Sequence, residues 1–101
     1  MSGAVLVRSQ DPERQLQGLR TALSLAMGDR PAGLYLEGAG LAALAVAPGS
    51  EAGQCLAALP EAGVLIGAEA DRTVALPDGA RRLSRRQLLA ALAAAEFQQT
   101  F

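Results

Sequence analysis

Histidine and tryptophan are absent from this chain of 101 residues. Without an imidazole, a single chain offers no Cys–His or Ser–His pair, no His-ligated metal and no imidazole acid or base. All nine basic residues are arginines, so there is no lysine to activate a thiol either. Cys55 is the only conventional soft nucleophile. These absences indicate a function that depends mainly on shape and on partners.

The single cysteine and the short apolar runs also indicate the cellular compartment in which the protein is expected. One cysteine cannot form an intramolecular disulfide, which fits a reducing cytoplasm. Residues 1–7 contain no basic leader, and no apolar stretch reaches the roughly 18 residues that a membrane span requires. We therefore expect a cytoplasmic protein that does not associate with membranes.

The chain has few aromatic residues and a small net charge. Aromatic residues make up only 3% of a chain that is 50% hydrophobic, so the core must consist of Ala, Leu and Val. The length fits one domain over residues 1–101. Because a small Ala/Leu-rich domain has little polar surface, we expect a homo-oligomer or a partner subunit. The net charge of −1 gives no basic field for nucleic acid, so direct nucleic-acid binding is not expected.

The first part of the chain predicts a strand, a helix and a second strand. Residues 4–7 form a continuous apolar run, which is typical of a parallel strand buried on both faces. Asp11 and Pro12 predict a helix start, and Gly28 predicts a left-handed stop. Residues 34–36 predict the second strand. The expected buried face of the helix consists of Leu16, Leu19, Leu23, Ala26 and Met27.

The middle of the chain predicts two more helical segments and a third strand. Residues 41–46 are expected to be helical, and a further helix is expected to start at Ser50 or Glu51 and to end at Pro60. Residues 63–66 predict the third strand, and residues 67–73 predict a loop or a degenerate turn of helix.

A short extended piece, residues 80–83, precedes the last predicted helix. Ser84 and Gln87 match a capping box, with Leu83 and Leu88 at the positions of a hydrophobic staple. Residues 97–101 could add an edge strand. This order predicts a small three-layer α/β domain, with a mainly parallel sheet of about five strands and helices on both faces.

The layout resembles the DsrE/DsrF/DsrH-like family of small sulfur-relay proteins, which includes the Tus subunits of tRNA 2-thiolation. The likeness extends over almost the whole chain and rests on four segments: residues 5–7 before a leucine-striped helix, 34–40, 63–67, and 80–84 before the last helix. The resemblance implies that sulfur-carrying members hold a persulfide on a cysteine just after the third strand. The matching stretch here, residues 67–70, has no cysteine.

The chain is therefore more similar to DsrH-type members, which lack the carrier cysteine and serve in assembly or docking. This resemblance implies a non-catalytic or docking subunit in intracellular sulfur transfer. Its partners would be like subunits or sulfur-carrier proteins, and no cofactor is implied.

Cys55 leaves a second hypothesis open, that of a sulfurtransferase carrying persulfide on this thiol. A thiolate near a helix N-terminus has a lowered pKa and can attack a sulfur donor. However, Cys55 falls on the apolar stripe of its predicted helix, with Ala52, Leu56 and Leu59. A buried core thiol is the simpler interpretation.

A candidate ligand or partner loop combines Glu37, Gly38 and Gly40 with Gly67 and Ala68. The first three lie at the predicted carboxyl end of a strand, where open α/β sheets bind ligands. They would suit a small nucleotide- or anion-binding module, or they simply form a tight turn.

The charged residues near the end of the chain supply the remaining candidates. The only charge cluster is a basic patch of Arg81, Arg82, Arg85 and Arg86. It is either a solvated face or a contact for RNA phosphates or an acidic protein. Loop carboxylates, Glu69, Asp71 and Asp78, match no known metal loop, so no metal site is predicted.

Overall fold

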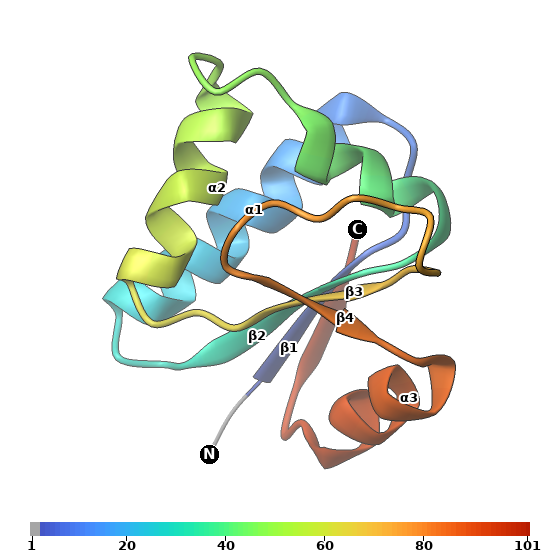
Figure 1. The fold of residues 1–101 in the computed structure, drawn as a ribbon. Coiled ribbons are helices and arrows are strands. Elements are labelled where there is room, and N and C mark those ends of the chain that lie inside the picture. Colours follow the sequence, from blue (N-terminus) through green and yellow to red (C-terminus); the bar gives the residue numbers. More distant parts are fainter. Residues whose placement is uncertain (1–2) are drawn as a thin grey trace.

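Five parallel strands form one sheet in the computed structural model, which describes residues 3–101 (Figure 1). The spatial order is β4-β3-β2-β1-β5, and every pairing between neighbours is parallel. The strands are β1 (Gly3–Val7), β2 (Ala32–Leu36), β3 (Ile66–Glu69), β4 (Ala80–Leu83) and β5 (Gln98–Thr100).

Helices cover both faces of this sheet. One face carries α1 (Pro12–Met27), the 3₁₀ helix η1 (Gly38–Ala45) and α2 (Glu51–Glu61), and the other carries α3 (Arg85–Ala94) (Figure 1). The predicted three-layer α/β class is confirmed. Within residues 3–101 no helix is long and apolar enough to cross a membrane.

Two cores result from the alternation of side chains along each strand. In β1, Val5 and Val7 face the larger core under α1, η1 and α2, whereas Ala4 and Leu6 face the smaller core under α3. All residues of β1 and β2 are buried, which explains the continuous apolar run predicted for a strand covered on both faces. The larger core also contains Leu19, Leu34, Leu36, Leu59 and Ile66, and the smaller contains Tyr35, Leu83 and Leu88.

The start of α1 agrees with the sequence, but its end does not. The Asp11 carboxylate accepts a hydrogen bond from the Glu13 amide at 3.1 Å, and Pro12 is the first helical residue. Gly28 was predicted to be left-handed, yet its φ is −92°, and Asp29 adopts φ 58° instead. Asp tolerates this conformation because its short polar side chain can hydrogen-bond locally. Met27 is 76% exposed, so its assignment to the buried face was wrong.

Boundaries in the middle of the chain also differ from the prediction. The helical segment expected over 41–46 is the 3₁₀ helix η1, which begins earlier, at Gly38. Pro60 lies inside the last turn of α2 and does not end it. The third strand starts at Ile66, not at residue 63, because a left-handed Gly63 and a Val64 amide bonded back to the helix occupy the intervening residues.

The predicted start of α3 is confirmed in detail. The Ser84 hydroxyl accepts from the Gln87 amide at 3.1 Å, and the Gln87 side chain accepts from the Ser84 amide at 2.8 Å. Leu83 and Leu88 are both buried in the smaller core, as expected of a hydrophobic staple. The expected last edge strand is β5, which pairs with β1.

Replacing Ser84 by Ala should lower the free energy of unfolding by about 1 kcal/mol, because it removes the cap of α3. Urea denaturation measures the change. Ser24→Ala provides the matched control, since Ser24 is an exposed position inside α1 where Ala is the better helix former. Equal losses from the two substitutions would contradict the capping box.

Candidate functional site

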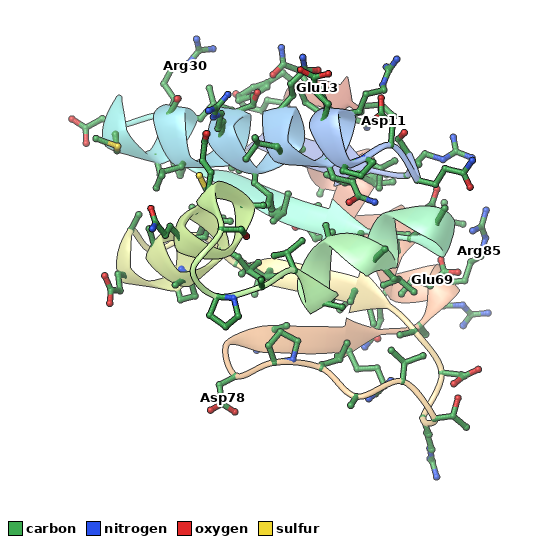
Figure 2. The ribbon with its side chains drawn as sticks, turned by 90° about the horizontal axis from the view of Figure 1, so that it is seen from above. Asp11, Glu13, Arg30, Glu69, Asp78 and Arg85 are labelled. Carbon is green, nitrogen blue, oxygen red and sulfur yellow. The ribbon has the colours of Figure 1, made fainter. Side chains whose placement is uncertain are left out.

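Four charged side chains gather where the parallel strands end. Arg8 follows β1, Glu37 follows β2, Glu69 ends β3, and Arg85 starts the helix that follows β4. Arg8 Nε lies 2.8 Å from Glu37 Oε1. Arg85 Nη1 lies 3.4 Å from Glu37 Oε2 and 3.3 Å from Glu69 Oε2. We call these four residues the edge cluster; Figure 2 shows Glu69 and Arg85 close together within it.

The carboxylates of the edge cluster are covered, and its guanidinium groups are exposed. The Glu37 and Glu69 side chains are 14% and 26% exposed, against 63% for Arg8 and 66% for Arg85. Together with Gly38 and Ala39, the cluster lines an open depression of about 300 Å³. None of these lining residues carries a thiol, hydroxyl or amine. The depression is therefore suited to binding by charge and hydrogen bonds, not to thiol or hydroxyl chemistry.

Gln15 ties together the loops that carry Arg8 and Glu37. Its side chain is buried, and its Nε2 donates to the carbonyl of Ser9 at 2.9 Å and, more weakly, to that of Ala39 at 3.5 Å. Sequence reasoning missed this residue. It shares its buried face with Leu19 and Ala22 at the i, i+4, i+7 spacing of a helix, which was the available signal.

The predicted ligand loop is only partly present. Glu37 and Gly38 line the depression, whereas Gly40 is buried and does not line it. A Cβ on Gly40 would lie 2.1 Å from the Val7 carbonyl oxygen, so this glycine allows η1 to pack on the end of β1. Gly38 has φ 54° and forms the turn.

The prediction that Gly67 and Ala68 belong to this loop was wrong. Gly67 and Ala68 lie within β3 and are buried, so they belong to the sheet and not to a loop. The carboxyl end of this strand is at Glu69, and Ala70 is the first residue after it.

Cys55 lies apart from the edge cluster. It is half-buried in α2 and packs against the larger core, in line with its predicted position on the apolar stripe. The N-cap of α2 is Ser50, so the thiol lies in the second turn and not at the helix terminus.

The predicted basic patch is divided by the structure. Arg81 and Arg82 are neighbours in β4 and therefore point to opposite faces of the sheet. Arg82 donates to the carbonyls of Asp71 and Val74 and so holds the β3–β4 connection. Arg85 belongs to the edge cluster.

The three carboxylates weighed as cation ligands are not gathered into a site. Glu69 pairs with Arg85, and Asp78 lines an apolar hollow beside Pro77. Asp71 accepts from the hydroxyl of Thr73 at 2.5 Å and from its amide at 2.9 Å. The hydroxyl contributes most to holding the pKa of Asp71 below its usual value. In the part of the chain that the structure describes, no three metal-ligating side chains cluster.

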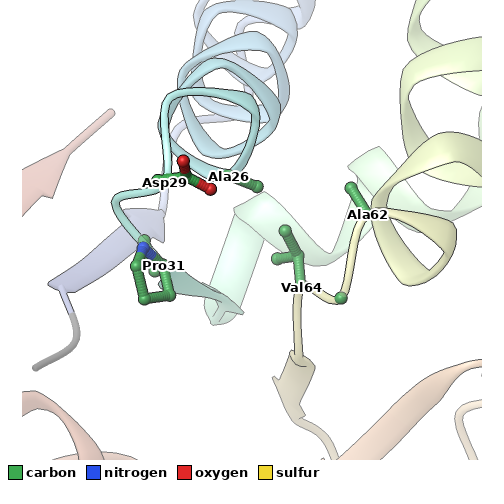
Figure 3. A pocket seen from close by; sticks show the side chains of 7 residues that line it. Ala26, Asp29, Pro31, Ala62 and Val64 are labelled. Atoms are coloured by element: carbon green, nitrogen blue, oxygen red, sulfur yellow. The ribbon is translucent and has the colours of Figure 1, made fainter.

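A second hollow, of about 230 Å³, lies near the ends of α1 and α2 and the start of β2 (Figure 3). Among the described residues that line it, Asp29 is the only charged one, and small or apolar residues such as Ala26, Pro31 and Val64 complete the lining. With so few polar groups to orient a ligand, this hollow is a weaker candidate than the depression at the edge cluster.

Comparison with known proteins identifies the fold but no close relative. No family model matches the sequence, and no curated protein is significantly similar to it. Among solved structures, the crystal structure of the ychN protein from E. coli matches with a TM-score of 0.81 and 21% sequence identity, over 100% of both chains. The chain therefore has a DsrE/DsrF-like fold, as the resemblance implied.

Gly40→Ala should lower the free energy of unfolding by about 2 kcal/mol or more, because the added Cβ would collide with the backbone of β1. Gly49→Ala is the matched control: a Cβ there meets no atom within 4 Å, so stability should change by less than about 0.5 kcal/mol. Urea denaturation compares the two. If Gly40→Ala were as mild as its control, the close packing of η1 on β1 would be wrong.

Thr73→Val should raise the pKa of Asp71 toward its usual value, since the hydroxyl that stabilises the ionised carboxylate is removed. The stabilisation from this contact is present above the usual pKa of Asp and is lost as the pH falls through the lowered value. Carboxyl ¹³C NMR follows the titration. Thr21→Val is the control: it removes a hydroxyl that donates to the Gln17 carbonyl in α1, and it should leave the pKa of Asp71 unchanged. If Thr73→Val also left the pKa of Asp71 unchanged, the Thr73 hydroxyl would not be the cause of the lowered pKa.

Proposed function

We propose that this protein is a cytoplasmic, non-catalytic docking subunit in intracellular sulfur transfer. In this role it binds like subunits or sulfur-carrier proteins, and any sulfur chemistry takes place on a thiol that the partner supplies. The DsrE/DsrF-like fold supports this proposal at the level of architecture.

The observation that carries the proposal is the chemistry at the end of β3. The resemblance implies that carriers have their cysteine just after this strand, and here the strand ends in Glu69 followed by Ala70. The Glu69 carboxylate is paired with Arg85. An acceptor of sulfane sulfur needs a thiolate, and neither residue provides one.

Cys55 supplies the only alternative thiol, and its position favours a structural role. It packs against the larger core from the middle of α2 and does not line the depression. A persulfide carrier must present its sulfur to a donor and then to an acceptor, which requires an accessible thiol. The half-buried position of Cys55 is better suited to filling space beside the core.

Native mass spectrometry after incubation with inorganic polysulfide tests the proposal, with Cys55→Ser as the control. We expect the wild-type protein to gain no sulfur and to appear as a multiple of the chain mass or as a complex with an added carrier protein. Labelling of Cys55 by iodoacetamide should be slow in the native protein and fast after denaturation.

A gain of one sulfur atom that Cys55→Ser abolishes would overturn the docking role and make Cys55 a carrier. A strictly monomeric protein that takes up no sulfur and binds no carrier protein would also contradict the proposal.

A further inference from the structure

We propose that the depression at the edge cluster binds a small anion, a carboxylate or a compact oxyanion, between Arg8 and Arg85. This inference is separate from the proposed function, since binding a free anion needs neither sulfur nor a partner protein. It rests on the hydrogen-bonding capacity, the order and the charge balance of the cluster.

Both guanidinium groups have more N–H donors than the two carboxylates of the edge cluster use. Each guanidinium carries five N–H groups. Arg8 approaches Glu37 through Nε, and Arg85 approaches both carboxylates through Nη1. Within residues 3–101, neither guanidinium has another acceptor at hydrogen-bonding distance, and both side chains are mostly exposed. The remaining donors are available to a ligand.

Glu37 orders both arginines before any ligand arrives. Its Oε1 is paired with Arg8 and its Oε2 with Arg85, so one largely covered carboxyl group holds the two guanidinium groups on either side. Flexible arginine side chains normally lose rotamer freedom when they bind, and here part of that loss has already occurred. The depression of about 300 Å³ has room for roughly ten water-sized groups.

The charge balance of the cluster selects the class of ligand. Arg8 and Arg85 are offset by Glu37 and Glu69, so the formal charge of the cluster is zero. Additional negative charges on a ligand are then attracted and repelled to similar extents. Affinity comes from short-range, forked hydrogen bonds, which guanidinium groups make well to carboxylates and oxyanions. A single compact anionic group should therefore bind as well as a polyphosphate.

The test is an NMR titration of the ¹⁵N-labelled protein with acetate, sulfate and ATP at one fixed ionic strength. We expect the amides of Gly38 and Ala39 to shift, with similar dissociation constants for the three ligands. Arg8→Gln and Arg85→Gln should each weaken acetate binding about tenfold, because each removes a charge-assisted hydrogen bond. Arg85→Lys should also weaken it, since the charge remains but the fork is lost.

Arg86→Gln is the matched control. It removes the same charge from the neighbouring residue of α3, which is exposed but does not line the depression. Acetate affinity should stay within about twofold of wild type. The dispersion of each spectrum shows whether a variant is folded.

Two results would overturn the anion site. One is the absence of shifts at Gly38 and Ala39 with acetate and sulfate at about 100 mM. The other is an affinity that rises steeply with ligand charge and falls equally in Arg85→Gln and Arg86→Gln, which indicates diffuse attraction to arginines.

A short peptide with a free terminal carboxylate, compared with the same peptide carrying a terminal amide, then identifies the source of the anion. Tighter binding of the free acid than of acetate indicates a partner chain, and equal binding indicates a free anion.

Discussion

The parallel direction of all five strands is the constraint on which the rest of the structure depends. Parallel neighbours need a crossover between them, so helices must lie on the faces of the sheet and the strands must be buried. The same direction brings every carboxyl end to one edge. Arg8, Glu37, Glu69 and Arg85 meet there although they belong to four separate segments of the chain. Both the core and the edge cluster follow from this one choice of strand direction.

Features with local causes were predictable from the sequence. The capping box at Ser84 needs only residues within one turn of α3, and the Asp11–Pro12 start of α1 is equally local. Features set by contacts between distant segments were not. The start of β3 depends on which residue reaches β2, where the Leu34 amide donates to the Leu65 carbonyl. The apolar run over residues 63–66 does not indicate where that pairing begins, because all four residues are compatible with a strand.

The candidate site shows the same division. Glu37 and Arg85 were singled out from the sequence, but as parts of a loop and of a basic patch; that they pair follows from strand order, which the sequence does not state. Arg8 was not selected, since nothing near it in the chain distinguishes it. Gln15 was not selected either, although it shares the buried face of α1 with Leu19 and Ala22. Gly40 was predicted to belong to a candidate ligand loop or to a tight turn, and its actual constraint is a carbonyl oxygen of β1, more than thirty residues earlier. The chemical character of each single residue could be predicted from the sequence. The ion pairs and close contacts between residues far apart in the chain could not.

The pairing of β5 with β1 has a consequence for the order of events during synthesis. The Leu6 carbonyl accepts from the Phe101 amide, and the Phe101 carbonyl accepts from the amides of Arg8 and Ser9. The backbone of Arg8 is thus fixed by residues that the ribosome releases more than ninety positions later. Contacts of such long sequence separation form slowly, and a growing chain exposes its unpaired strand edge until they do. The backbone of Arg8, from which one arginine of the edge cluster extends, therefore gains its hydrogen bond to Phe101 only after residues 98–101 have been synthesised.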